Sequence, residues 1–180
     1  MMIRFFITVS LFVAVSDAAC GFPNGTDTKI NWWQGSGSAS AKITTIATQD
    51  ASGNPEYPIK LHEKLYVKAH LINSEAVPWN DPGFTLSITL WEYGGFSGCS
   101  WSEVPTFGLL TNMDACKNGV SCPLPTGEND IIVVLDFTSF GSIINLLTDD
   151  SPYQLELNFK DKKSGHTFSV FAQARCRTKE

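Results

Sequence analysis

The chain has 180 residues, a formal charge of −5 at pH 7 and a pI of about 5.1. Its charges are spread along the sequence, so no basic stripe offsets a phosphate backbone and nucleic acid is not an expected partner. Net charge does not favour binding to anionic membranes at neutral pH either.

The first 18 residues have the layout of a secretory signal peptide. Arg4 precedes an apolar run over residues 5–15, and Ser16-Asp17-Ala18 ends in a small-x-small pattern. A membrane anchor and a buried first strand are the alternatives, but the run is about half the ~20 residues that a spanning helix needs. We therefore expect a signal peptide over 1–18, cleaved after Ala18, and one exported domain over 19–180.

One N-glycosylation sequon, Asn24-Gly25-Thr26, follows the leader. In an exported chain it marks Asn24 as an exposed glycosylation site, and an unused triplet is the alternative.

Short segments of period-two alternation follow in chain order, separated by Gly, Pro, Asn and Asp. Alternation places side chains on opposite faces of a sheet and so predicts half-buried strands. The strands that we expect are a weak one at 42–48 and stronger ones at 65–71, 84–90, 153–159 and 166–175.

The run 131–135 is apolar without alternation, which is typical of a strand covered on both faces. Only 140–147 has a pattern that allows a helical turn, and Gly141 with the following Asp-Asp-Ser-Pro keeps it short. Seven or eight short strands with these turn signals predict an all-β fold, an antiparallel sandwich or barrel, without a second domain.

Five cysteines in an exported chain predict disulfides and at least one cysteine left over. Cys116 and Cys122 flank the turn-forming Asn118-Gly119 and are the first-choice bridge, because they can close a short loop. Cys20 and Cys176 lie near the ends of the mature chain and are the second choice, since domain termini are often close in space. Cys99 is then left over, and its pairing with Cys116 or Cys122 competes.

Several segments together resemble the ML (MD-2-related lipid-recognition) family, most closely its GM2-activator-like and nematode-type members. They are Cys20 after the leader, Gly98-Cys99-Ser100-Trp101, the run 122–128 (CPLPTGE), the run 152–156 (PYQLE), and Asp161 with Ser164-Gly165 before a terminal strand. The resemblance spans nearly the whole mature chain. The family usually has an even cysteine count and often a cysteine inside the last strand, whereas 168–171 (FSVF) has none.

The resemblance implies an immunoglobulin-like β-sandwich of two antiparallel sheets that splay around an apolar cavity. Twelve Phe and five Trp are compatible with this, although large aromatic residues also fill solid cores. The candidate cavity residues are Leu65, Val67, Leu86, Ile88, Leu90, Val133, Leu135, Leu155, Leu157, Phe159, Phe168 and Val170. A lip for transient membrane contact is expected from Ile143, Ile144, Leu146, Leu147, Trp79, Phe96 and Trp101, with a small satellite core as the alternative.

We identify no enzyme, cofactor or metal site in the sequence. His62, His70 and His166 have no zinc spacing and accompany no nucleophile motif. The acidic residues Asp149, Asp150 and Asp161 lack the loop pattern of a calcium site.

The resulting hypothesis is a secreted lipid-binding or lipid-transfer protein for a sterol, phospholipid or glycolipid, with the lysosomal lumen as the alternative location. Its further partners would be a receptor or a lipid hydrolase. The competing hypothesis is a secreted immunoglobulin-like module with a solid core that binds protein, although the Cys…Trp…Cys arrangement of true immunoglobulin domains is missing.

Overall fold

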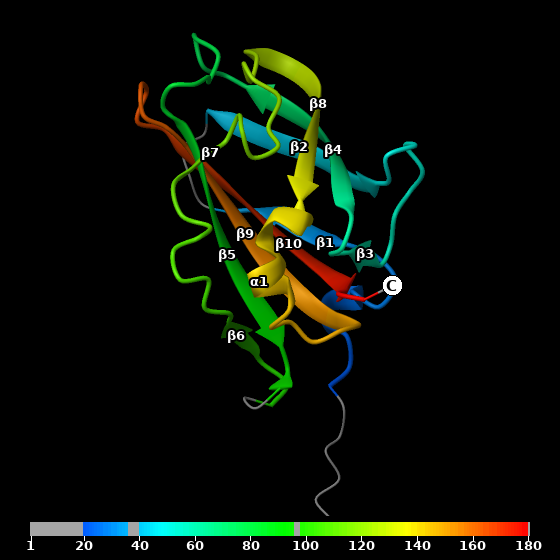
Figure 1. Cartoon of the computed structure of the whole chain (residues 1–180). Coiled ribbons are helices and arrows are strands. Elements are labelled where there is room, and N and C mark those ends of the chain that lie inside the picture. Colours follow the sequence, from blue (N-terminus) through cyan, green and yellow to red (C-terminus); the bar gives the residue numbers. More distant parts are fainter. Residues whose placement is uncertain (1–19, 36–39, 96–97, 180) are drawn as a thin grey trace, which may run out of the picture.

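The computed structural model describes residues 20–35, 40–95 and 98–179. The expected signal peptide at 1–18 lies outside them, as does Phe96. Two sheets face each other and the short helix α1 (Gly141–Ile144) lies in front of them (Figure 1). The predicted all-β sandwich of two sheets is confirmed.

The larger sheet has the strand order β1-β10-β9-β5-β6, and the small strands β3 and β7 pair with β10 and β5. All its pairings are antiparallel except the short one between β3 and β10. The strand bounds are β1 Asn31–Gln34, β3 Ile59–Lys60, β5 Phe84–Tyr93, β6 Trp101–Glu103, β7 Met113–Asp114, β9 Ser151–Asp161 and β10 Thr167–Arg177.

The smaller sheet consists of β2 (Ala41–Gln49), β4 (Lys64–Asn73) and β8 (Gly127–Asp136) in the order β2-β4-β8. Both of its pairings are antiparallel, with one irregularity between Ile43 and Thr45. Two short 3-10 turns complete the described elements: η1 (Pro23–Gly25) and η3 (Phe137–Phe140), which leads into α1.

Every segment with strong alternation is a strand, because alternate side chains cover the space between the sheets while the others face water. The run 131–135 differs from the prediction. It lies within β8, and Ile132 on its outer face is 42% exposed, so this strand is not covered on both sides.

Two disulfides join Cys116 to Cys122 and Cys20 to Cys99. The first-choice bridge is confirmed, whereas the pairing of Cys20 with Cys176 and both other pairings of Cys99 are wrong. Cys176 is buried on the inward face of β10, where it is a free thiol. Cys20 instead lies beside Gly94 at the end of β5, close to Cys99.

Candidate functional site

Two adjoining hollows lie between the sheets. The narrow hollow has a volume of about 100 Å³ and is bounded by β2, β4 and β8 on one side and by β9 and β10 on the other. The wide hollow has a volume of about 320 Å³ and extends from there between β5, β8 and α1. The two hollows adjoin, because their linings share Leu61, Leu135, Phe137, Tyr153, Leu155, Leu157 and Cys176.

The narrow hollow is almost entirely apolar, and the polar side chains on its lining already have partners. The Thr48 hydroxyl donates to the Glu56 carbonyl over 2.7 Å. The Tyr153 hydroxyl lies 3.0 Å from the Glu92 carboxylate and 2.9 Å from the Thr148 carbonyl, and burial raises the pKa of this phenol. A polar ligand group in this hollow would lose its bonds to water without replacing them, which disfavours it.

Cys176 lies where the two hollows meet, on the lining of both. Burial raises the pKa of its thiol to about 12, so the group stays neutral at physiological pH. A neutral thiol behaves as a small apolar surface, in keeping with the rest of the lining.

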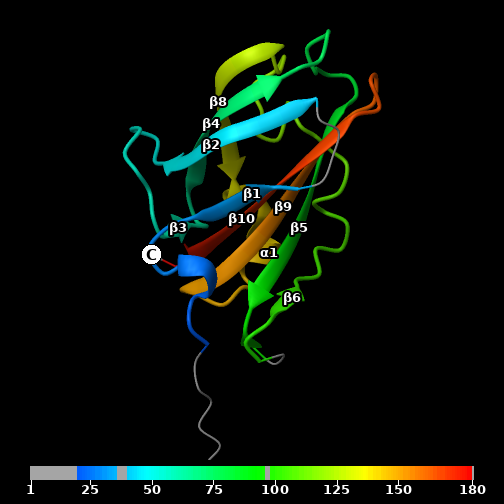
Figure 2. The ribbon, with the colours of Figure 1, turned by 180° about the vertical axis from the view of Figure 1, so that it is seen from behind.

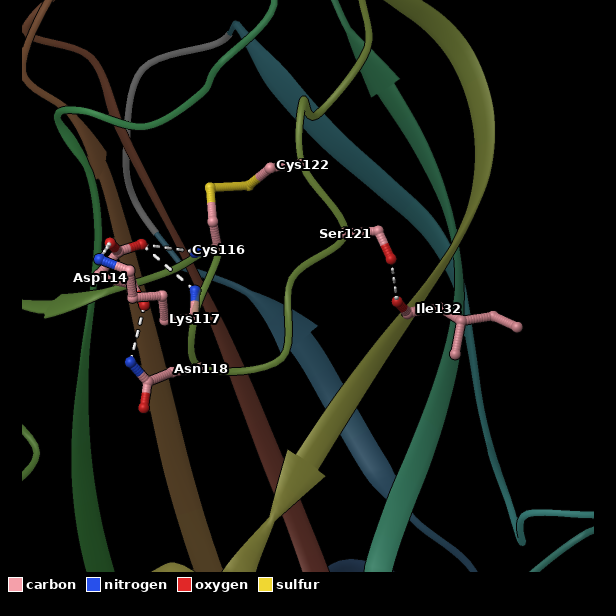
Figure 3. Close-up of a disulfide and its surroundings, with 7 residues drawn as sticks. All are labelled: Asp114, Cys116, Lys117, Asn118, Ser121, Cys122 and Ile132. Atoms are coloured by element: carbon pink, nitrogen blue, oxygen red, sulfur yellow. Dashed lines mark hydrogen bonds and ion pairs between the residues drawn. A yellow bond between two sulfur atoms is a disulfide. The ribbon is translucent and has the colours of Figure 1, made fainter.

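The disulfide loop forms one wall of the wide hollow, through Lys117, Asn118 and Gly119. Figure 3 shows how it is held: the Asp114 carboxylate accepts from the backbone N–H groups of Cys116 and Lys117 at 3.0 and 3.3 Å. Gly119 has a φ of +104°, and a Cβ there would lie 2.0 Å from the Val134 carbonyl oxygen. The Asn-Gly pair thus allows the loop to lie directly against the edge of β8.

Polar residues gather on the rim of the wide hollow. Lys64 lies 3.3 Å from Asp136, and Lys117 lies 3.0 Å from Asp114. The hydrogen bond from Lys117 holds the pKa of Asp114 below its usual value, and the Thr138 hydroxyl does the same for Asp136. The rim therefore carries both signs of charge beside an apolar interior.

Most of the predicted cavity residues line this space. Leu65, Val67, Val133, Phe159, Phe168 and Val170 line the narrow hollow, Ile88 and Leu90 the wide one, and Leu135, Leu155 and Leu157 both. Leu86 lies elsewhere: it is fully buried in the packed core with Phe84 and Trp79.

The predicted lip needs correction. Ile143, Ile144 and Leu147 line the wide hollow, and Ile143 and Leu147 are buried, whereas Leu146 beside them is 63% exposed. Trp79 is only 1% exposed, because its ring packs between Phe84 and Phe168 in the core.

Trp101, also predicted for the lip, lies on β6, where it packs against Tyr93 with ring centroids 5.0 Å apart, and lines neither hollow. The predicted Phe96 lies outside the described residues.

Two exposed apolar residues near the hollow were missed by the sequence analysis. Phe107 is 81% and Leu109 55% exposed, and both precede Leu110, which is buried on the lining of the wide hollow. Phe107 has a φ of +50°, which is rare for an aromatic residue. The Thr106-Phe107-Gly108-Leu109-Leu110 run has an apolar cluster but no periodicity that predicts its exposure.

The described part of the chain contains no group of three or more His, Cys, Asp or Glu side chains that could hold a metal ion. Among the same residues, no helix has the length and apolar character needed to cross a membrane.

No protein-family model matches the sequence, and no curated protein sequence matches it either. Among solved structures, the chain is similar to a Niemann-Pick type C2 protein from the Japanese carpenter ant, with 17% identity and a TM-score of 0.41 over 78% of this chain and 96% of that one. It is also similar to the C-terminal domain of wzt, with 8% identity and a TM-score of 0.33 over 82% of this chain and 74% of that one.

Proposed function

We propose that this protein is a secreted lipid-binding or lipid-transfer protein that holds an apolar ligand between its two sheets. The main support for the proposal is the pair of adjoining hollows, whose linings are mostly apolar and come from both sheets. Protein interiors are normally packed to the density of organic crystals, so an interior space of this size suits a ligand.

The chemistry of the lining supports a hydrocarbon ligand. Burying a methylene group is worth about 0.8 kcal/mol, so a sixteen-carbon chain gains about 12 kcal/mol against water. The polar end of a sterol, phospholipid or glycolipid would lie at the rim, near Lys64, Asp136 and Lys117, where water and charged partners remain.

Transfer requires contact with a membrane, because escape of a lipid through water is slow. The exposed apolar residues Phe107, Leu109 and Leu146 each lie within three positions of a residue that lines the wide hollow. We therefore assign the membrane contact to these three residues, in an extracellular or lysosomal compartment. A receptor or a lipid hydrolase would receive the ligand.

The alternative, a protein-binding module with a solid core, is disfavoured by the hollow. The deciding experiment is native mass spectrometry of the protein secreted from a eukaryotic host, followed by organic extraction and lipid analysis. We expect a bound lipid that is released on denaturation. Protein that is ligand-free and takes up no sterol, phospholipid or glycolipid from vesicles would refute the proposal.

A further inference from the structure

A row of amide side chains crosses the outer face of the larger sheet, away from the hollow. Gln173 is at its centre: its Oε1 accepts from Asn31 Nδ2 over 2.9 Å, and its Nε2 donates to Gln154 Oε1 over 2.7 Å. These residues face outward, because Ala172 and Ala174 on either side of Gln173 line the hollow.

An aromatic row runs beside the amide row. Trp33 stacks on Phe171 with ring centroids 5.1 Å apart and planes 2° apart, and Trp91 follows 6.4 Å from Phe171. Trp33 is 38% exposed and lies on the edge strand β1. Neither the hollow nor the membrane contact uses these rings.

Asn24 of the sequon contacts this outer face through a hydrogen bond. Asn24 is exposed, and its Nδ2 donates to Gln173 Oε1 over 2.7 Å. Figure 2 shows η1, which contains Asn24, against the ends of β9 and β10 and next to β1. The segment around η1 covers Gln173, which is 3% exposed, and leaves Trp33 open to solvent.

We propose that Asn24 carries an N-linked glycan whose first sugars lie against the stacked Trp33 and Phe171 rings. The donor is a lipid-pyrophosphate-linked oligosaccharide of the secretory pathway. A bond forms between Asn24 Nδ2 and C1 of the first sugar, the C1–O bond to the pyrophosphate breaks with its electron pair, and the amide loses one of its two protons. This inference is independent of the bound lipid.

The geometry fits this occupant. After transfer the Asn24 amide keeps one N–H, which is enough to maintain its bond to Gln173. Phe171 is two residues from Gln173 along β10, or about 7 Å, which is within reach of the first sugars. Sugar C–H groups pack on aromatic faces, and sugar hydroxyls pair with amides such as Gln154.

The fold also requires that Asn24 be glycosylated before the N-terminal segment folds. Thr26, the third residue of the sequon, is fully buried, and its hydroxyl donates to the Pro23 carbonyl over 2.6 Å. The transferase must read this hydroxyl before the N-terminal segment folds onto the sheet.

The test combines glycopeptide mass spectrometry of the secreted protein with the rate of native deglycosylation by a peptide-N-glycosidase. We expect an occupied Asn24 and a release that is about fivefold faster in Trp33→Ala than in wild type, because the variant loses a ring contact. Phe107→Ala, which removes an exposed ring elsewhere, should release at the wild-type rate, and Trp33→Phe should restore most of the protection. If all proteins release the glycan at equal rates after denaturation and have unchanged melting temperatures, a folding defect is excluded as the cause of the faster native release.

An unoccupied Asn24 overturns the proposal, as does equal native release from wild type and Trp33→Ala. An unglycosylated protein that forms dimers through Trp33 would assign this face to a second copy of the chain and would also overturn it.

Discussion

His70 lies between two carboxylates on the outer face of the smaller sheet. Its Nδ1 is 2.7 Å from Asp130 and its Nε2 is 2.9 Å from Glu128, both on β8, while Lys68 on its own strand lies 3.8 Å from Asp130. A neutral imidazole has one N–H, so only the protonated ring donates to both carboxylates. The hydrogen bonds from Asp130 and then Glu128 raise the pKa of His70 above its usual 6.5.

The raised pKa predicts pH-dependent stability with a defined sign. Folding raises this pKa, so the protonated His70 contributes to the free energy of unfolding. That contribution is complete below pH ~6.5 and is lost as the pH rises through the folded-state pKa. We expect His70→Gln to lower the free energy of unfolding more at pH 5.5 than at pH 8.5, as measured by urea denaturation. An equal effect at both pH values would show that the ring acts only by packing.

The buried Cys176 thiol gives a second prediction at this scale. Its pKa of about 12 leaves little thiolate at pH 8, and thiolate is the reactive form. We expect a maleimide to label the native protein at least ~100-fold more slowly than the urea-unfolded chain. Mass spectrometry after timed quenching measures both rates, and rapid native labelling would show that the interior opens readily to solvent.

At the scale of elements, Gly119 allows the disulfide loop to pack closely against β8, where the loop forms part of the wall of the wide hollow. Gly119→Ala introduces a Cβ 2.0 Å from the Val134 carbonyl oxygen at a φ of +104°. Gly53 is a matched control, because its φ is +84° and a Cβ there meets nothing within 4 Å.

An alanine at a positive φ costs about 1–2 kcal/mol of backbone strain in both the Gly119→Ala and the Gly53→Ala variant. We expect Gly119→Ala to destabilise the protein by a further ~1–3 kcal/mol, because the loop must move away from β8. Chemical denaturation of both variants measures the difference, and equal losses would mean that the close approach has no energetic role.

The exposed apolar residues of the two loops beside the hollow predict a kinetic effect. In the proposed membrane contact, changing Phe107 or Leu146 to Ser would remove up to ~1.5–3 kcal/mol of favourable burial per side chain. We expect the double variant Phe107→Ser/Leu146→Ser to transfer lipid between vesicles about tenfold more slowly, with an unchanged melting temperature. Val77→Ser, at a residue that is 66% exposed but lines neither hollow, should transfer at the wild-type rate. Unchanged transfer by the double variant would remove both residues from the contact.

Leu147 is not suitable for this test, although it is next to Leu146. It is 9% exposed and packs among the residues of the wide hollow. A Ser there would create a cavity and reduce stability, so slower transfer would have two explanations.

At the scale of the whole molecule, the proposed binding of a ligand in the hollow predicts a gain in stability. A ligand that binds only the folded state stabilises it by about 2.7 kcal/mol at 100 times its Kd, which raises the melting temperature of a domain this size by about 5–10 °C. Val133→Trp places an indole in the narrow hollow, whereas Ile132→Trp places the same side chain on the outer face of β8.

We expect lipid addition to raise the melting temperature of wild type and of Ile132→Trp, and to have a much smaller effect on Val133→Trp. Differential scanning fluorimetry with and without lipid measures this. An equal shift in both variants would mean that the ligand binds outside the narrow hollow.

The local features of this protein follow from the order of its residues. Alternation at 65–71, 84–90, 153–159 and 166–175 predicted four strands and their inward faces, because the period of a half-buried strand appears directly in the order of its residues. The Asn-Gly between Cys116 and Cys122 likewise predicted the bridge that closes this loop. Short strands such as β3 and β7 have too few residues to show a period.

Features that depend on contacts between residues distant in sequence could not be predicted in this way. Pairing Cys20 with Cys99 joins residues 79 positions apart. Cys176 is buried because β10 continues to Arg177, beyond the predicted strand end at 175, and Ile59 of β3 pairs with it there. Trp79 and Leu146 are both apolar residues in irregular segments, yet packing buries the first and exposes the second. The hollow itself is the space left where the two sheets fail to meet, and no local pattern of residues encodes the distance between two sheets.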